Sequence, residues 1–336
     1  MATLKRRGMT ALAGIAVMAV AVTGCSTNDD APAEDQQDDS SSEASVEYPI
    51  TVTDMAGNEV TIESADSVVV TDNRVFQIVA DWGVQPTAAP RSLMTENNPM
   101  ESDESILDIG THGEPDFEQV VAADPDLVLN GYRFTDHADD MQNAAPDAAF
   151  VDMNVPEDDE ISTDEYLIRS VTLLGEIFGK EDEAEALVDD FHAAVDEARN
   201  AYDPETTVMG LITSGNEIRY SSPTDGRGAS IFFDLLELTP ALDAEGSSFD
   251  QGDDISIEAI AEAEADFFLV LDREAAFDDG EATPAFELIT TSPSLTNVPA
   301  VQDEAIYVMP ADYYRTEDII AYTTVLEELA AAFGDQ

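Results

Sequence analysis

The sequence predicts an α/β protein with two similar lobes, a long connecting helix between them, and a ligand cleft where the lobes meet. Two observations lead to this prediction. Short apolar runs typical of buried strands alternate with stretches of helical spacing, which is the pattern of a parallel sheet covered by helices. A helix–strand segment of the first half also recurs in the second half. The predicted parts are an N-terminal lobe at 48–157, a connecting helix at 158–204 and a C-terminal lobe at 205–336.

The N-terminus has the features of an export signal. Three basic residues at 5–7 precede an uncharged apolar run at 11–22, as in secretory signal peptides, and the run is too short to span a bilayer. It ends in Val-Thr-Gly before Cys25, the single cysteine, which resembles the lipobox of bacterial lipoproteins, where the cysteine is acylated. We expect a signal peptide at 1–24 and a lipid anchor at Cys25 on the extracytoplasmic face of the cell membrane. The alternative is an uncleaved signal anchor beside a chance cysteine.

The next segment and the overall charge limit the possible partners. Residues 25–47 are acidic, contain no aromatic residue and have too little apolar surface to fold, so we expect a disordered tether. The whole chain carries a formal net charge of -60. Such a charge repels nucleic acid, which excludes nucleic-acid-binding functions. A surface this acidic also repels itself unless salt screens it, which favours a halophilic source organism.

Several segments of the N-terminal lobe have clear patterns. Residues 51–62 alternate in polarity around a Gly-Asn turn, which predicts a β-hairpin. Three consecutive valines within 67–71 predict a buried strand, and helical spacing at 74–82 before a Gly- and Pro-containing stop predicts a helix. A second helix at 117–123 leads into a strand at 127–130. The order of these segments predicts a β-α-β arrangement.

Apolar residues keep a helical period from 163 to 202, which predicts the connecting helix. This stretch is longer than an ordinary helix of a globular protein, and Gly179 is the residue at which an interruption is expected if there is one. In either case a long helical region follows one α/β unit and precedes another. A cleft between two such units is a common place for a small ligand to bind.

The second α/β unit repeats the first without a gap at an offset of 140 residues. Twelve residues that begin at Glu118 align with twelve that begin at Glu258. Both copies then reach an arginine at the same step, Arg133 and Arg273. A generic helix–strand pattern explains the apolar match, but it does not explain the shared glutamate and arginine. The repeat therefore predicts two similar lobes.

Three stretches resemble class III periplasmic-type binding proteins for iron siderophores. They are Asp-Ile-Gly-Thr-His-Gly-Glu-Pro-Asp-Phe-Glu at 108–118, the helix followed by Pro125-Asp126 and a strand, and Gly-Asp-Asp-Ile-Ser-Ile-Glu at 252–258. The resemblance is greatest to the branch that includes petrobactin-binding and other ferric-catecholate-binding lipoproteins. It implies two Rossmann-like lobes and a monomer that captures a ferric siderophore and delivers it to the permease and ATPase subunits of an ABC importer.

The resemblance also implies which residues bind the ligand. In that branch three arginines clamp the anionic catecholates, and the matching positions are Arg133, Arg227 and Arg273, of which Arg227 lies in a loop one residue longer than the family pattern. Guanidinium groups suit this role because they keep a fixed positive charge and offer fork-shaped pairs of donors. The alternative is that these arginines offset local acids in a very acidic chain.

Some members of the branch complete the iron shell with a tyrosine and a histidine. The matching tyrosine is Tyr314 or its neighbour Tyr313, and the histidine position holds Gln251, which is a poor ligand for ferric iron. The three histidines of the chain show no metal-ligand spacing. We therefore expect no direct coordination of a metal by the protein and no resident cofactor.

Glu118 and Glu258 match the glutamates that dock this class of protein onto arginines of the permease.

Two other functions remain open. One is the same class of binding protein with a ferric hydroxamate, haem or cobalamin as its ligand. The other is a lipid-anchored extracellular enzyme, although the chain has neither a Gly-x-Ser-x-Gly nor a His-Glu-x-x-His motif. The neutral or weakly charged ligands of the first alternative do not call for three arginines, and a third possibility, a purely adhesive or structural surface protein, does not explain the glutamate and arginine of the repeat.

Overall fold

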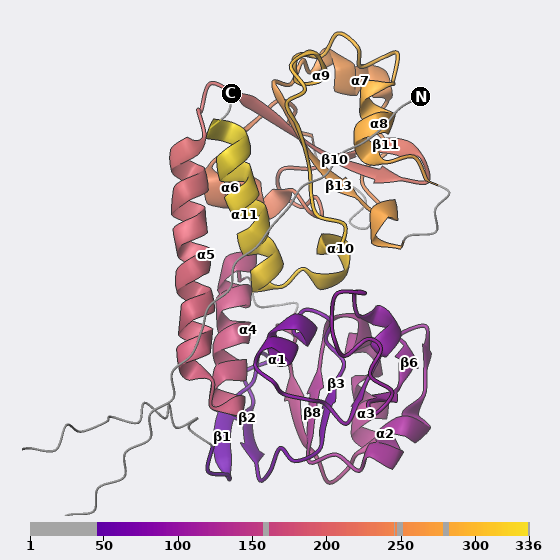
Figure 1. The fold of residues 1–336 in the computed structure, drawn as a ribbon, viewed down its shortest axis with the longest axis vertical. Coiled ribbons are helices and arrows are strands. Elements are labelled where there is room, and N and C mark those ends of the chain that lie inside the picture. Colours follow the sequence, from indigo (N-terminus) through magenta and orange to yellow (C-terminus); the bar gives the residue numbers. More distant parts are fainter. Residues whose placement is uncertain (1–45, 157–160, 245, 247–250, 278–281, 335–336) are drawn as a thin grey trace, which may run out of the picture. The chain divides into compact units, whose positions relative to one another are not determined.

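The fold is described from a computed structural model of the chain (Figure 1). The structure describes residues 46–156, 161–244, 246, 251–277 and 282–334. The predicted signal peptide, the lipidation site Cys25 and nearly all of the predicted tether lie outside these ranges. In the part of the chain that is described, no helix is both long enough and apolar enough to cross a bilayer.

The N-terminal lobe contains a five-stranded parallel sheet in the order β5-β4-β3-β8-β9. Its central register places Val69 opposite Val128, and both side chains are fully buried, as expected for parallel strands covered on both faces. The antiparallel hairpin predicted at 51–62 is confirmed as β1-β2. The strands are β1 (Ile50–Thr53), β2 (Glu59–Ile62), β3 (Val68–Val70), β4 (Ala88–Ala89), β5 (Leu107–Asp108), β6 (Gly110–Thr111), β7 (Glu114–Pro115), β8 (Leu127–Asn130) and β9 (Ala149–Asp152).

Helices cover both faces of this sheet. Val69 and Val128 pack against α2 and α3, whereas Val68 and Val70 point to the other face and join the cluster that contains α1 and α4. Successive strand residues point to opposite faces, so the all-valine strand β3 contributes to both layers. The helical elements of the lobe are α1 (Phe76–Asp81), η1 (Arg91–Leu93), α2 (Phe117–Ala123), η2 (Tyr132–His137) and α3 (Ala138–Ala144).

The helical region between the lobes is not one unbroken helix. It forms α4 (Thr163–Phe178) and α5 (Glu181–Ala201), and Gly179 between them adopts a left-handed conformation with φ of 64°. A glycine accepts this conformation without a steric penalty, which explains why the break occurs there. The two helices lie side by side (Figure 1). The longer one, α5, extends from the region of the β1-β2 hairpin up to α6, whereas α4 covers only part of this length.

The C-terminal lobe is built on the sheet β11-β10-β13-β14, with β12 also paired to β10. Strands β10, β13 and β14 are parallel, and β11 is antiparallel to β10. The strands are β10 (Thr207–Ser214), β11 (Glu217–Ser221), β12 (Thr239–Pro240), β13 (Phe267–Asp272) and β14 (Ile306–Val308). The helical elements are α6 (Ser230–Leu236), α7 (Ile257–Glu262), η3 (Glu274–Ala276), α8 (Ala285–Thr290), α9 (Pro299–Gln302), α10 (Tyr313–Thr316) and α11 (Ile319–Gly334).

The last helix, α11, fixes the C-terminal lobe to the long helix α5, beside which it lies (Figure 1). Phe333 near its end packs against Tyr202 and Phe267, with ring centroids 5.1 and 5.0 Å apart. Because aromatic side chains bury a large area, these contacts tie the sheet, α5 and α11 into one core.

The repeat in the sequence is also a repeat in the structure. Asp126 accepts a hydrogen bond from the backbone N–H of Ser67 at 3.1 Å, and Asp266 accepts one from Thr207 at 2.9 Å. Each aspartate precedes its strand and fastens it to the neighbouring strand. The helices before them also begin alike, with a side-chain cap at their N-termini. These matches confirm that the two units are similar.

Candidate functional site

Tyr314, on α10, is the centre of the candidate site. The guanidinium carbons of Arg227, Arg273 and Arg133 lie 4.0, 5.4 and 5.8 Å from the centroid of its ring. These are the three arginines predicted from the sequence, and they come from both lobes. At such distances a guanidinium group is attracted to the face of an aromatic ring. The fold therefore brings all three predicted arginines to one tyrosine.

The repeat accounts for the positions of two of these arginines. Arg133 follows β8 and Arg273 follows β13, so both lie past the carboxyl ends of parallel strands, which is the edge where α/β sheets usually bind ligands. Arg273 donates from Nε to the Tyr314 hydroxyl at 3.3 Å and pairs with the adjacent Glu274 at 3.3 Å. Arg133 is half-buried, and no carboxylate of the described residues forms an ion pair with it.

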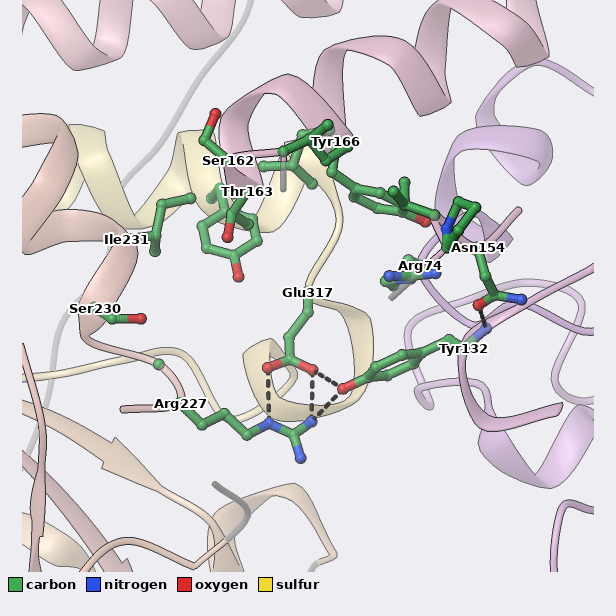
Figure 2. A pocket seen from close by; sticks show the side chains of 16 residues that line it. Arg74, Tyr132, Asn154, Ser162, Thr163, Tyr166, Arg227, Ser230, Ile231 and Glu317 are labelled. Atoms are coloured by element: carbon green, nitrogen blue, oxygen red, sulfur yellow. Dashed lines mark hydrogen bonds and ion pairs between the residues drawn. The ribbon is translucent and has the colours of Figure 1, made fainter. Parts of the chain in front are cut away.

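Arg227 is held differently, because it is buried and two of its nitrogens bind one carboxylate. It follows β11 in a loop, and only 5% of its surface is exposed. Its Nε donates to Glu317 Oε1 at 2.8 Å and its Nη2 donates to Oε2 at 2.5 Å (Figure 2). Burial alone would lower the pKa of the guanidinium, but the Glu317 carboxylate outweighs it and holds that pKa above its ordinary value.

Tyr132 joins this ion pair from the N-terminal lobe. Its hydroxyl donates to Glu317 Oε2 at 2.7 Å and accepts from Arg227 Nη2 at 2.9 Å (Figure 2). Burial, followed by the negative charge of Glu317, raises the pKa of the Tyr132 hydroxyl well above its ordinary value, so the hydroxyl stays protonated. The direction of the hydrogen bonds follows from this, since a protonated phenol must donate to the carboxylate. The three residues link the two lobes.

A fourth arginine, Arg74, lies on the other side of Tyr132. Its guanidinium carbon is 4.5 Å from the Tyr132 ring centroid and 4.2 Å from that of Tyr166 on α4. It also pairs with the buried Asp72 at 2.6 Å. Burial lowers the pKa of Arg74, and the Asp72 carboxylate raises it by more, so the net shift is upward. Arg74 is therefore a fixed charge held between two rings and a carboxylate.

Arg74, Tyr132, Arg227 and Glu317 line a cavity of about 390 Å³ between the lobes and α4, whereas Tyr314, Arg133 and Arg273 are not among its lining residues. Arg74, Tyr132 and Asn154 line it from the N-terminal lobe, and Arg227 and Glu317 from the other side (Figure 2). The lining also includes Val155, Pro156, Ile161, Ser162, Thr163, Tyr166, Leu167, Gly228, Ser230, Ile231 and Tyr322. A cavity that is lined by both lobes and contains charged groups is suited to a small anionic ligand.

The sequence analysis missed a further arginine, Arg315, which follows Tyr314. Its Nη2 donates to the carbonyl of Ser92 at 2.9 Å and also to the carbonyl of Met94, both in the N-terminal lobe. Burial lowers the pKa of its guanidinium, and the nearby charge of Arg133 lowers it further, although Asp312 acts in the opposite direction. Nothing in the repeat marks Arg315, because it lies in the C-terminal segment that the repeat does not reach.

Other predicted site residues lie outside this cluster. Tyr313 points into the core, where it packs against Phe232 and Tyr322 with ring centroids 6.4 and 5.3 Å away. Gln251 is exposed in a turn. Of the two tyrosines left open by the sequence, Tyr314 is therefore the one placed with the arginines.

The two predicted docking glutamates occupy equivalent places. Glu118 is in the first turn of α2 and Glu258 is in the first turn of α7, and both are exposed. Each lies on a helix that covers its own lobe, away from the residues that line the cavity. Their position leaves them accessible to a protein partner.

The histidines lie apart from any metal-binding group of the residues that the structure describes. His137 contacts the backbone carbonyl of His112 at 2.8 Å, and His192 packs beside Phe191 on α5. Across the described ranges, no group of three His, Cys, Asp or Glu side chains is placed to hold a metal ion.

Comparison with known proteins gives two relatives that are both described as binding proteins for siderophores. The ferric-anguibactin-binding protein FatB of Vibrio anguillarum is 26% identical over 231 residues, which is 68% of this chain and 70% of that protein. The petrobactin-binding protein YclQ of Bacillus subtilis is 24% identical over 227 residues, 67% of this chain and 68% of that protein.

Solved structures show the same fold. The crystal structure of YclQ superposes with a TM-score of 0.72 at 18% identity and covers 86% of this chain and 100% of that one. The siderophore-binding protein BauB, bound to two molecules of acinetobactin and ferric iron, also has a TM-score of 0.72, at 20% identity, over 85% of this chain and 99% of that one. The family model described as "Periplasmic binding protein" matches residues 68–313. Because this match covers well over half of the sequence, the chain belongs to the periplasmic binding protein family.

Proposed function

We propose that this protein captures a ferric siderophore, of the catecholate class, outside the cytoplasm and delivers it to the permease and ATPase of an ABC importer for iron uptake. One observation carries the proposal: Arg133, Arg227 and Arg273 surround the Tyr314 ring where the two lobes meet. A ferric complex of three doubly deprotonated catechols is a trianion with aromatic rings. Guanidinium groups around a tyrosine suit both properties.

The relatives support a ferric siderophore as the ligand. The chemical class of that siderophore is argued from the residues of this chain. Two of them are described as binding ferric anguibactin and petrobactin. The alternatives of a ferric hydroxamate, haem or cobalamin do not call for several arginines, because these ligands are neutral or weakly charged. The alternative of an enzyme is set aside, since the chain belongs to a family of binding proteins.

A competition titration tests the ligand class. Purified protein that lacks residues 1–45 is titrated with a ferric triscatecholate and with ferrioxamine, a ferric trihydroxamate, and binding is followed by quenching of protein fluorescence. The proposal expects tight binding of the catecholate and no displacement of it by ferrioxamine. Preferential binding of ferrioxamine would favour the hydroxamate alternative, and binding of neither would contradict the proposed function.

A lipid anchor at Cys25 is part of the proposal, because the basic start, the short apolar run and the Val-Thr-Gly-Cys junction occur together. Acylation by two or more chains holds a protein stably on a membrane. Mass spectrometry of the native N-terminus tests this, and Cys25→Ser is expected to move the protein from the membrane fraction to the soluble fraction. An intact Met1, or cleavage at another residue, would contradict it.

We also propose adaptation to high salt, on the basis of the net charge of -60. The Debye length falls from about 10 Å at 0.1 M salt to about 3 Å at 1 M, so repulsion between the surface acids weakens across this range. The melting temperature is therefore expected to rise with sodium chloride. A melting temperature that stays constant between these concentrations would contradict the proposal.

A further inference from the structure

The cavity between the lobes contains a carboxylate that opposes the binding of anions. Glu317 lines the cavity, has only 8% of its surface exposed and receives two hydrogen bonds from Arg227 (Figure 2). The two guanidinium nitrogens and the two carboxylate oxygens match in pairs, which is the strongest arrangement for such an ion pair. The Nε and Nη2 donors of Arg227 are thus already bound to an internal anion.

The position of Glu317 is also fixed from the N-terminal lobe. The Tyr132 hydroxyl donates to Glu317 Oε2 at 2.7 Å, and it is a lasting donor because its proton is not lost at ordinary pH. Glu317 follows α10, three residues after Tyr314, so its carboxylate is attached to the same short segment as the centre of the site. Contacts from both lobes therefore hold the negative charge next to the predicted clamp.

A buried carboxylate affects ligands according to their charge. It partly cancels the attraction of Arg227 for an anion and repels each negative charge that enters the cavity, and both effects are larger where water is excluded. A trianionic complex experiences this repulsion about three times as strongly as a monoanionic complex of similar shape. Charge-dependent repulsion of this kind is how a binding site discriminates between related ligands.

We propose that Glu317 is a specificity-determining residue that competes with the ligand for Arg227 and shifts the preference of the site from trianionic ferric complexes toward complexes of lower negative charge. This inference rests on the proposed function, because it concerns the choice among ferric siderophores. It assigns to Arg227 a different part from that of Arg133 and Arg273, because the Glu317 carboxylate competes with the ligand for its Nε and Nη2 donors.

The test uses a variant that removes the charge and keeps the shape. Glu317→Gln retains a carbonyl oxygen that can accept from Arg227, so it is expected to fold. Glu262→Gln, at an exposed position on α7, changes the net charge of the chain equally but far from the cavity. Each protein is titrated, at one fixed salt concentration, with a trianionic ferric triscatecholate and with a monoanionic ferric bis-catecholate.

Glu317→Gln is expected to tighten binding of the trianionic complex by about tenfold, the size of one charge-assisted contact, and binding of the monoanionic complex by a smaller factor. Glu262→Gln is expected to leave both dissociation constants within about twofold of the wild type, as is usual for an exposed charge. An unchanged or weaker affinity of folded Glu317→Gln for the trianion would overturn the proposal and make Glu317 a residue that orients Arg227.

Glu317→Asp provides a second test if the glutamine variant does not fold. It keeps the charge but withdraws the carboxylate by one methylene, so it is expected to give a smaller gain for the trianionic complex in the same direction. No gain in this variant would likewise overturn the proposal. If the wild type binds neither ferric complex, the proposed function itself fails, and the inference fails with it. If the wild type binds and the variants bind equally well, the inference alone fails.

Discussion

The guanidinium carbon of Arg227 lies 4.0 Å from the centroid of the Tyr314 ring, which is the shortest of the three arginine contacts of that ring. Because the same ring also faces Arg133 and Arg273, Tyr314 holds positive charges from both lobes near one another. Such contacts are worth roughly 0.5 to 2 kcal/mol each, more where water is excluded. The ring is therefore expected to matter more than its hydroxyl group.

Tyr314→Leu is expected to weaken binding of a ferric catecholate about tenfold or more, since it removes the ring that positions the arginines. Tyr314→Phe keeps the ring and removes the hydrogen bond that Arg273 donates, so a smaller loss is expected. Titration of both variants by fluorescence checks this order. Equal losses in the two variants would show that the hydroxyl, and not the ring, is required.

Arg133→Ala and Arg273→Ala are each expected to weaken binding of a trianionic ferric complex about ten- to hundredfold, because each removes one charge-assisted contact. The matched control is Arg169→Ala on α4, whose side chain is 40% exposed and pairs weakly with Glu165 at 3.9 Å. That control is expected to bind as the wild type does. If all three variants bind equally well, the arginine clamp is wrong and a neutral ligand becomes the better hypothesis.

Arg199, although distant from the site, is a poor control for such an experiment. Its Nε donates to the backbone carbonyl of Leu235 at 3.0 Å, which ties α5 to the end of α6. Truncation of this side chain would leave a carbonyl without its partner and reduce stability. A change in ligand binding in that variant would therefore be ambiguous.

Arg227→Ala is expected to destabilise the protein as well as change its affinity. The substitution leaves the buried Glu317 carboxylate without its guanidinium partner, and such losses cost about 3 to 5 kcal/mol. The double variant Arg227→Ala with Glu317→Ala removes both charges and is expected to recover a large part of this loss. Urea denaturation of the two variants and of Arg133→Ala measures the difference. A double variant no more stable than Arg227→Ala would contradict the ion-pair explanation.

Glu118→Ala and Glu258→Ala are expected to leave ligand affinity unchanged and to impair iron uptake by cells, because both side chains are exposed on the first turns of α2 and α7. Glu262→Ala, on the same helix as Glu258, removes an exposed glutamate whose counterpart in the first unit is Ala122 rather than a glutamate, and it serves as the control. Loss of ligand binding in the purified variants would place the two glutamates at the ligand or in the core, and normal uptake would remove the docking role.

The sequence predicted the parts of the site that depend on local pattern and on the repeat. The offset of 140 residues marked Arg133 and Arg273, and the structure places both at Tyr314. The strands and helices of the repeat were also predicted correctly, because buried parallel strands read as apolar runs. Arg227 was found by its resemblance to a family loop pattern.

The side chains that contact the site arginines could not be found from the sequence in this way. Glu317 is one of 73 acidic residues and lies 90 positions from Arg227, so no spacing connects the two. The contacts of Arg74 likewise come from Asp72, Tyr132 and Tyr166. These three residues lie close together only after the N-terminal lobe and α4 have packed. Contacts between distant segments depend on the fold as a whole, and a pattern along the chain does not contain them.

Asp318, next to Glu317, gives a prediction about pH. It is 2% exposed at the start of α11, and its Oδ1 accepts from the backbone N–H of Ala321 at 2.8 Å. Burial raises the pKa of this carboxyl to about 7, and the negative charge of Asp81 contributes to the shift. The carboxyl group therefore holds its proton more tightly in the folded protein than in the unfolded chain.

The sign of the pH effect follows from this raised pKa. The stability that Asp318 contributes is fully present below its unfolded pKa, near 4, and is lost as the pH rises through about 7. Asp318→Asn does not titrate and keeps the cap on α11, since asparagine and aspartate cap equally well. The variant is therefore expected to be more stable than the wild type at pH 8, by up to about 4 kcal/mol, and by only about 1.5 kcal/mol at pH 5. Urea denaturation at both pH values, at one fixed salt concentration, measures this difference, and a gap that does not widen with pH would show that Asp318 is ionised throughout.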